Sequence, residues 1–366
     1  MPWCVCFVLP LSYSVFTVLS AGAAQRRVPP RDAATATRRA RSASGSCAEK
    51  PGFQQQAETG MMSSAACDGK TMFGVVVAGL GIAGQVRIRD LLSPLPSSPA
   101  EKMSIKGFVS RRNLQEQQGV TQIPLDEALS REDIHAAIVS TENSSHEDYV
   151  RKFLEAGKHV CVEYPMALSY AAAVELFRLA DEKGKVLHVE HIELLAADYR
   201  QLKKEVCGKS LQEGSLHFTA GPVAPGFGSL AFSGISRLTW LVDLFGELSV
   251  TGAKLTEEPE KKYTKLTAHL LTQDRRSLTW IEERGPGLRR NKTIDLRFDS
   301  GRVDQLPAVP RDPVGLFAQD LRIFGRKLLG QVATEALQAE RKRVLHCLQL
   351  ADRISQLVQA PQQSAS

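Results

Sequence analysis

The sequence predicts an α/β fold followed by an α+β fold: a doubly wound parallel sheet, then a large, mostly antiparallel sheet. Between residues 73 and 195, short continuous apolar runs alternate with helical patterns, which is typical of parallel strands buried on both faces. After Gly214 the runs alternate in polarity and follow one another closely, which favours antiparallel strands. The chain has 366 residues, of which 43% are apolar, and is therefore long enough for two domains.

The N-terminal elements follow one another regularly. A strand at 73–78 leads into the glycine turn Gly79-Leu-Gly81-Ile-Ala-Gly84 and a helix that ends near Leu92. Further strands are expected at 105–109, 136–139, 159–162 and 186–189, and helices at 144–154 and 169–182. This order predicts a Rossmann-type domain over residues 71–195.

Each glycine of the turn has a physical reason. Gly79 allows the tight turn, Gly81 lets the backbone approach a pyrophosphate, and Gly84 allows the helix to pack closely on the strand. The N-terminus of the helix then faces the phosphates. In this strand-to-helix context the turn predicts dinucleotide binding, with a purely structural turn as the alternative.

The second strand ends in Ser110-Arg111-Arg112, where an NAD site usually places an acid. A hydroxyl and two guanidiniums would bind a 2′-phosphate that an acid would repel, so NADPH is the expected cofactor and NADH the alternative. A solvated basic turn is the competing interpretation. Ser140 and His146 follow the 136–139 strand at the same edge and are expected to line the cofactor as well.

The strand at 159–162 delivers Glu163-Tyr164-Pro165 at its carboxyl end, where ligands bind in open α/β sheets. The phenol of Tyr164, with an ordinary pKa near 10, is the expected proton donor. Glu190 and Glu193 are three residues apart, and on a first helical turn their carboxylates would share one face. Such a pair would form an acidic face that could be functional, and the alternative is that both acids only stabilise the helix N-terminus.

No metal site is expected, because His188 and His191 lack a third ligand of convincing spacing. In the C-terminal part, strands are expected at 215–220, 248–255, 263–271, 277–282 and 293–298, and helices at 316–329 and 334–358. Arg237 is the one charged residue in the small and apolar stretch 232–240, so it needs either an internal salt bridge or a substrate carboxylate.

The formal charge of +6 is concentrated at the N-terminus, where residues 1–48 hold six arginines and one acid. The remainder is near neutral, so a nucleic acid partner is not expected. The apolar run 3–22 and the arginine-rich, acid-poor stretch 25–48 predict that residues 1–70 are a disordered or targeting-like extension. No later apolar run is long enough to span a membrane.

The cysteines form no framework, because only three of the seven lie after residue 70: Cys161, Cys207 and Cys347. Scattered thiols favour a reducing compartment, and we expect a cytoplasmic monomer.

Taken together, these segments resemble the biliverdin reductase A family, an outlying branch of the glucose-fructose-oxidoreductase-like dehydrogenases. The resemblance extends from residue 73 to about 357. Matching segments include the glycine turn, Ser144-Ser-His-Glu-Asp-Tyr149, Val162-Glu-Tyr-Pro-Met166, Phe232-Ser-Gly-Ile-Ser-Arg-Leu-Thr-Trp240 and Trp280-Ile-Glu-Glu283. The parent dehydrogenases carry Glu-Lys-Pro where this chain has Glu163-Tyr164-Pro165.

The resemblance implies NADPH-dependent reduction of the central methine bridge of biliverdin to give bilirubin. It implies that residues 196–366 form the substrate domain, that Glu163, Glu190 and Glu193 lie near the nicotinamide, and that Arg237 holds a propionate. Ordered water or a carboxylate remains an alternative proton donor. The chain departs from mammalian members at Ile82, where they carry arginine.

Two other functions compete with this one. A sugar or inositol dehydrogenase of the parent family is disfavoured because Tyr164 replaces the lysine. A nucleotide-binding regulator without turnover is disfavoured because the glycines, Tyr164 and Arg237 are all present.

Overall fold

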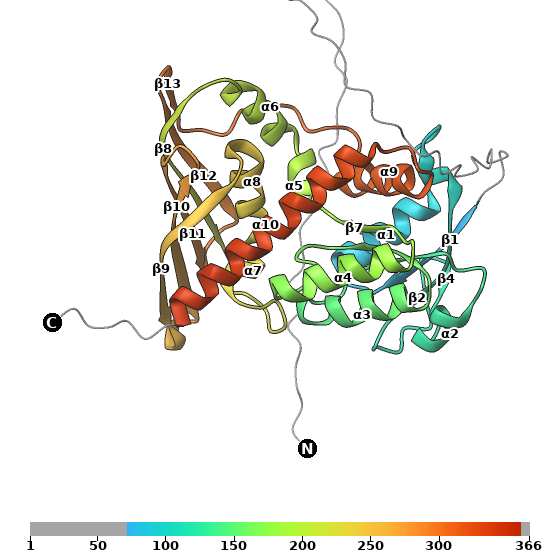
Figure 1. The fold of residues 1–366 in the computed structure, drawn as a ribbon. Coiled ribbons are helices and arrows are strands. Elements are labelled where there is room, and N and C mark those ends of the chain that lie inside the picture. The colour runs from blue at the N-terminus through green and yellow to red at the C-terminus, as the bar shows by residue number, and fades with distance from the viewer. Residues whose placement is uncertain (1–71, 360–366) are drawn as a thin grey trace, which may run out of the picture. The chain divides into compact units, whose positions relative to one another are not determined.

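The computed structural model describes residues 72–359, which contain two β-sheets flanked by helices (Figure 1). The extension expected over residues 1–70 lies outside the described residues. The expected succession of a parallel sheet and a mostly antiparallel sheet is confirmed.

The first sheet has five parallel strands in the order β2-β1-β5-β6-β7. Their bounds are Phe73–Ala78 (β1), Met103–Val109 (β2), Ala136–Val139 (β5), His159–Val162 (β6) and Leu187–Val189 (β7). The order reverses between β1 and β5, which is the point at which ligands bind in such sheets.

Helices cover both faces of this sheet because its strands are apolar on both sides. Val75 and Val77 of β1 pack with Ile88, whereas Val76 and Ala78 pack in the cluster that contains Phe153. The surrounding elements are α1 (Ile82–Leu92), η1 (Pro99–Lys102), the hairpin of β3 (Glu116–Gln117) and β4 (Val120–Thr121), α2 (Leu125–Ser130), α3 (Asn143–Glu155) and α4 (Tyr170–Glu182).

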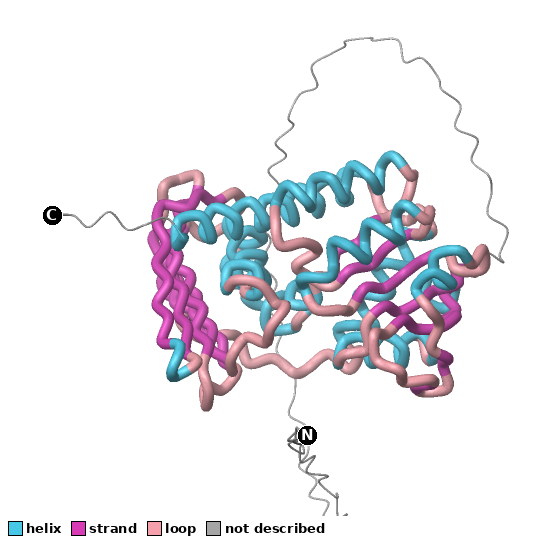
Figure 2. The backbone as a smooth tube through the Cα atoms, turned by 90° about the horizontal axis from the view of Figure 1, so that it is seen from below, coloured by secondary structure: helices cyan, strands magenta, loops and turns pink. Residues whose placement is uncertain are grey.

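The second sheet has six strands in the order β13-β12-β8-β11-β10-β9 and is drawn in magenta at one end of Figure 2. Its strands are β8 (Leu211–Ala220), β9 (Leu248–Glu258), β10 (Tyr263–Thr272), β11 (Ser277–Arg284), β12 (Asn291–Phe298) and β13 (Gly301–Val303). Only β8 and β11 pair in parallel; the other pairs are antiparallel. Four helices and one 3₁₀ turn precede or join these strands: α5 (Ile192–Leu195), α6 (Ala197–Val206), α7 (Leu230–Ser233), α8 (Ile235–Phe245) and η2 (Pro259–Lys261).

The last two helices, α9 (Leu316–Leu328) and α10 (Thr334–Gln359), tie the two sheets together. Leu321 and Phe324 of α9 join the core cluster of the parallel sheet, together with Ile88 of α1. The long helix α10 contacts both β9 and α4, and it is the red helix in Figure 1. The C-terminal part of the chain therefore contributes to the packing of the N-terminal sheet.

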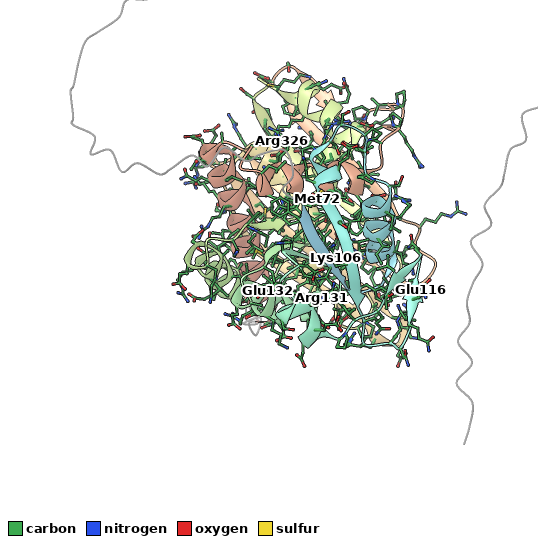
Figure 3. The ribbon with its side chains drawn as sticks, turned by 90° about the vertical axis from the view of Figure 1, so that its right-hand side faces the viewer. Met72, Lys106, Glu116, Arg131, Glu132 and Arg326 are labelled. Atoms are coloured by element: carbon green, nitrogen blue, oxygen red, sulfur yellow. The ribbon has the colours of Figure 1, made fainter. Side chains whose placement is uncertain are left out.

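Figure 3 views the side on which β1 and β2 lie, where charges of both signs alternate. Arg131 pairs there with Asp133 and Glu127, and Lys106 lies 4.0 Å from Asp133. These are ordinary solvated surface pairs. Among the described residues, no helix is both long and apolar enough to cross a membrane.

Candidate active site

The glycine turn leaves open space at one place only. Gly79 has a φ of +93°, and a Cβ there would lie 2.5 Å from the backbone oxygen of Ser140. A Cβ on Gly84 would lie 2.0 Å from the oxygen of Gly79, whereas a Cβ on Gly81 would meet nothing within 4 Å. Because α1 starts there without an acid or a side-chain cap, its free N–H groups fit a pyrophosphate.

Ser110, Arg111 and Arg112, which follow β2, have different contacts. The Arg112 guanidinium donates to the carbonyl of Leu80 at 2.8 Å, and its backbone N–H donates to Ser110 Oγ at 3.1 Å, so Arg112 braces the glycine turn. Arg111 is 74% exposed and pairs with Glu142 at 2.8 Å. Ser110 and Arg111 line a groove of about 570 Å³. Arg111 is thus the guanidinium best able to reach a 2′-phosphate.

His146 and Ser140, both expected to line the cofactor, differ in position. The ring nitrogens of His146 lie 2.8 Å from the carbonyl of Pro165 and 3.0 Å from that of Thr141, and the side chain is buried. His146 therefore braces the Glu163-Tyr164-Pro165 segment from beneath, and a direct cofactor contact does not follow from this geometry. Ser140 Oγ lies 3.5 Å from Glu163 Oε1, at the carboxyl edge of the sheet.

Tyr164 follows β6 and stacks on His191, with ring centroids 6.1 Å apart and planes 8° from parallel. Burial raises the pKa of Tyr164, and the nearby Glu190 raises it further, so the phenol keeps its proton at neutral pH. Arg237 and Ser236 act in the opposite direction and lower the pKa of the phenol, but they are outweighed. Burial lowers the pKa of His191 to about 3, so the imidazole that stacks on the phenol is neutral.

Glu190 and Glu193 do not share a helical face, so that expectation is wrong. Glu190 precedes α5, is fully buried, and accepts from the backbone N–H of Ile192 at 2.6 Å. Burial, Glu163 and Asp320 raise its pKa, so it is a protonated acid whose Oε2 has no hydrogen-bond partner among the described residues.

Glu193, in the first turn of α5, faces the second sheet. Its carboxylate accepts from Lys292 Nζ at 2.5 Å and from Arg290 at 3.1 Å. Burial acts to raise the pKa of Glu193, but Lys292 outweighs it and lowers the pKa, so Glu193 is ionised. The two acids thus have different protonation states.

Four cations gather on the strands and helix that face this site. We call them the basic cluster: Arg237, Arg284, Arg290 and Lys292. The three guanidiniums lie 4.0, 4.9 and 5.5 Å from the ring centre of Phe218, and Lys292 Nζ lies 3.5 Å from that of Trp240. The cluster faces two carboxylates, those of Glu282 and Glu193, and keeps a net positive charge.

Arg237 itself forms the internal salt bridge. Its Nε and one terminal nitrogen donate to Glu282 at 3.0 and 2.6 Å, and its other terminal nitrogen donates to Ser236 Oγ at 2.6 Å. The guanidinium is 4% exposed. Arg290, at 73% exposed, is the member of the basic cluster that solvent reaches.

A second charged group, which no sequence pattern predicted, lies behind Glu163. Arg87 of α1 is fully buried, and its guanidinium lies 3.0 Å from Glu163 Oε1 and 2.7 Å from Asp320 Oδ2 of α9. We call Glu163, Arg87 and Asp320 the charge clamp. Burial acts to lower the pKa of Arg87, but Glu163 and Asp320 outweigh it and raise the pKa.

Cys161, His188 and Asp320 form a group of three side chains whose ligand atoms lie within 4.8 Å of one another. Asp320 already pairs with the Arg87 guanidinium at 2.7 Å and lies 2.9 Å from His188 Nε2. Lys327 Nζ lies 2.7 Å from His188 Nδ1. Two cations at this distance do not suit a metal ion.

Two known families match this chain. The oxidoreductase family with an NAD-binding Rossmann fold matches residues 73–191, and the family described as biliverdin reductase, catalytic, matches residues 199–310. Human biliverdin reductase A (Homo sapiens) is 55% identical over 283 residues, which cover 77% of this chain and 95% of the human protein. The chain belongs to the biliverdin reductase A family. It is therefore an NAD(P)H-dependent oxidoreductase.

Biliverdin reductase A of Mus musculus is 54% identical, over 79% of this chain and 97% of the mouse protein. The fold is also that of a biliverdin reductase from Synechocystis sp. PCC 6803, solved in complex with biliverdin and NADP⁺. Its TM-score is 0.64 at 22% identity, covering 78% of this chain and 98% of that one.

Proposed function

We propose that this chain reduces biliverdin to bilirubin with NADPH, NADH being the alternative donor. When bound, the cofactor supplies a hydride that forms a C–H bond at the central methine carbon, and a proton is added to a pyrrolic nitrogen. The observation that carries the proposal is convergence within the biliverdin reductase A family's fold. Five strands of one parallel sheet end in these residues: Gly79 (β1), Ser110 (β2), Ser140 (β5), Glu163 (β6) and Glu190 (β7).

Tyr164 is the proton donor in this proposal. Its phenol stays protonated because burial raises its pKa, while the nearby Arg237 and Ser236 act to lower the pKa. Ser236 Oγ in turn accepts from Arg237, so a buried cation stands behind the acid and favours the phenolate that forms when the proton leaves. Glu190, whose raised pKa favours its protonated form, is the alternative acid near Tyr164.

The propionates of biliverdin require cations, and the basic cluster has an excess of them. Because Arg237 is enclosed by Glu282 and Ser236, we assign the direct propionate contact to Arg290, the exposed member of the basic cluster. Arg237 then has no direct contact with the pigment: it lowers the pKa of Tyr164 and holds Glu282 in place. The large ring of Phe218 beneath the guanidiniums supports their planes.

Residues 71–195 would bind the cofactor and residues 196–366 the pigment, with α9 returning to the cofactor side. Arg111 would read the 2′-phosphate once it leaves Glu142. We propose a cytoplasmic location because the thiols of Cys161, Cys207 and Cys347 are free, and a monomer stays our prediction.

A sugar or inositol dehydrogenase remains the competing enzyme, and a non-catalytic NADPH-binding regulator the competing class. Both are tested by one experiment. The full chain is incubated with biliverdin and NADPH, and absorbance spectra follow the loss of biliverdin and the appearance of bilirubin. Conversion that depends on both enzyme and NADPH is expected. NADPH binding without conversion would support the regulator instead.

A further inference from the structure

The charge clamp is unusual because two carboxylates surround one buried guanidinium. Arg87 Nε and a terminal nitrogen lie 3.1 and 3.0 Å from the same oxygen of Glu163, and a terminal nitrogen lies 2.7 Å from Asp320. The exposed fractions of the side chains are 0% for Arg87, 2% for Asp320 and 14% for Glu163. Only Glu163 reaches the site.

The neighbours Lys327, Glu340 and His188 leave this balance of charge unchanged. Lys327 pairs with Glu340 at 2.5 Å, so those two charges cancel. Burial and Lys327 act to lower the pKa of His188, Asp320 acts to raise it, and the net direction is upward. However, the ammonium of Lys327 can only donate, and it lies 2.7 Å from His188 Nδ1. In this arrangement Nδ1 is unprotonated, so His188 is neutral and donates from Nε2 to Asp320.

The charge clamp therefore carries one net negative charge. Burial acts to raise the pKa of Asp320, but the charge of Arg87 and the hydrogen bond from His188 Nε2 act to lower it, so Asp320 is ionised. It offsets the charge of Arg87. The carboxylate of Glu163 then keeps an unbalanced negative charge at the edge where the nicotinamide binds. If Asp320 were neutral, Arg87 would cancel Glu163 instead.

An unbalanced carboxylate matters for this reaction because the nicotinamide ring is neutral in NADPH and positive in NADP⁺. A fixed negative charge stabilises positive charge that develops during hydride transfer, and it costs no reorganisation when it is preorganised. We propose that Asp320 is a positioning residue of the reductase: by neutralising Arg87 it directs the negative charge of Glu163 onto the nicotinamide. This inference rests on the proposed use of NADPH.

The proposal is tested by binding rather than by turnover. The dissociation constants of NADP⁺ and NADPH are measured by fluorescence titration of the full chain without biliverdin. In Asp320→Asn the ratio of the NADP⁺ constant to the NADPH constant should rise about tenfold, because the oxidised ring loses more stabilisation than the reduced ring. Asp320→Glu should restore most of the ratio. Asp90→Asn, which removes another buried acid paired outside the clamp, should leave the ratio unchanged.

A structural role alone would weaken both forms of the cofactor equally and leave the ratio at its wild-type value, which would overturn the proposal. If Asp320→Asn does not fold, Glu163→Gln provides the same test, because it removes the charge on which Asp320 acts. An unchanged ratio in Glu163→Gln would also overturn it. The titrations contain no biliverdin, so they give the same ratio whether or not the protein reduces biliverdin. A failure of the proposed function can therefore be told apart from a failure of this inference.

Discussion

The charge clamp and the basic cluster are both built from acids and arginines, but they differ in what they leave exposed. In the clamp, Arg87 is fully buried between two carboxylates, and only Glu163 reaches the site. In the basic cluster, Arg237 is enclosed, whereas Arg290 is 73% exposed. Enclosed charges orient their neighbours and set the local field, whereas exposed charges remain available to a ligand. Substitutions in the two groups should therefore change different quantities.

The largest effect is expected at Tyr164, which follows Glu163 of the charge clamp directly and lies near Arg237 of the basic cluster. Tyr164→Phe removes the proton donor and keeps the ring that stacks on His191. We expect kcat to fall about 100-fold, in the range of a lost general acid, while the dissociation constant of biliverdin changes little. Steady-state kinetics and pigment titration measure the two. An unchanged kcat would transfer the proton to water or to Glu190.

Arg111 provides a comparison outside both groups. Arg111→Ala should raise the KM for NADPH about tenfold, the loss of one charge-assisted contact, and leave that for NADH nearly unchanged. Glu142→Gln should act in the opposite direction, because Glu142 competes with the phosphate for Arg111. Equal effects on the two cofactors would show that Arg111 does not read the 2′-phosphate.

Arg290 tests the exposed side of the comparison. Arg290→Ala should raise the KM for biliverdin about fivefold with little change in kcat, since a solvent-exposed ion pair contributes modestly. The difference from wild type should shrink at high salt. Arg297→Ala is the matched control: Arg297 is an exposed arginine of β12, the strand that begins directly after Arg290, and it is paired with Glu213. If both variants behave alike, the effect belongs to overall charge and not to the basic cluster.

Glu190 gives the smallest effect, a dependence of stability on pH. Its pKa is raised in the folded protein, whereas in the unfolded chain it ionises above pH about 4.3, so unfolding releases a proton between these two values. Wild-type stability should therefore fall as pH rises through this window. Glu190→Gln has no such proton and should gain about 1 kcal/mol relative to wild type for each pH unit of this window that lies between pH 5 and pH 8. Urea denaturation at both pH values measures this; a difference that does not vary with pH would contradict the protonated state.

The sequence predicted the frame of the site well because that frame is local. The strands at 73–78, 136–139 and 159–162 have the expected bounds, and each delivers its site residue to one edge through parallel pairing alone. The acids that pair with Arg87 and Arg237 could not be predicted in this way. Asp320 meets Arg87 only because α9 packs on α1, and Glu282 meets Arg237 only through the placement of β11. Contacts between such distant segments can be anticipated from sequence only where a charged residue stands alone in an apolar stretch, as Arg237 does in residues 232–240.

His146 also shows that the sequence does not determine which way a side chain faces. Its place after β5 predicted a cofactor contact, but its ring turns inward to the carbonyls of Pro165 and Thr141. Position along the chain determines which edge of the sheet a residue approaches, and side-chain packing determines which way it faces.

The most direct test of the whole account follows the hydride itself. NADPH that carries deuterium at the transferable position of the nicotinamide is incubated with the full chain and biliverdin, and the bilirubin product is examined by mass spectrometry and proton NMR. We expect one deuterium per bilirubin, located on the central bridging carbon, which is a methine in biliverdin and a methylene in bilirubin. Bilirubin without deuterium, or with deuterium at another carbon, would contradict it.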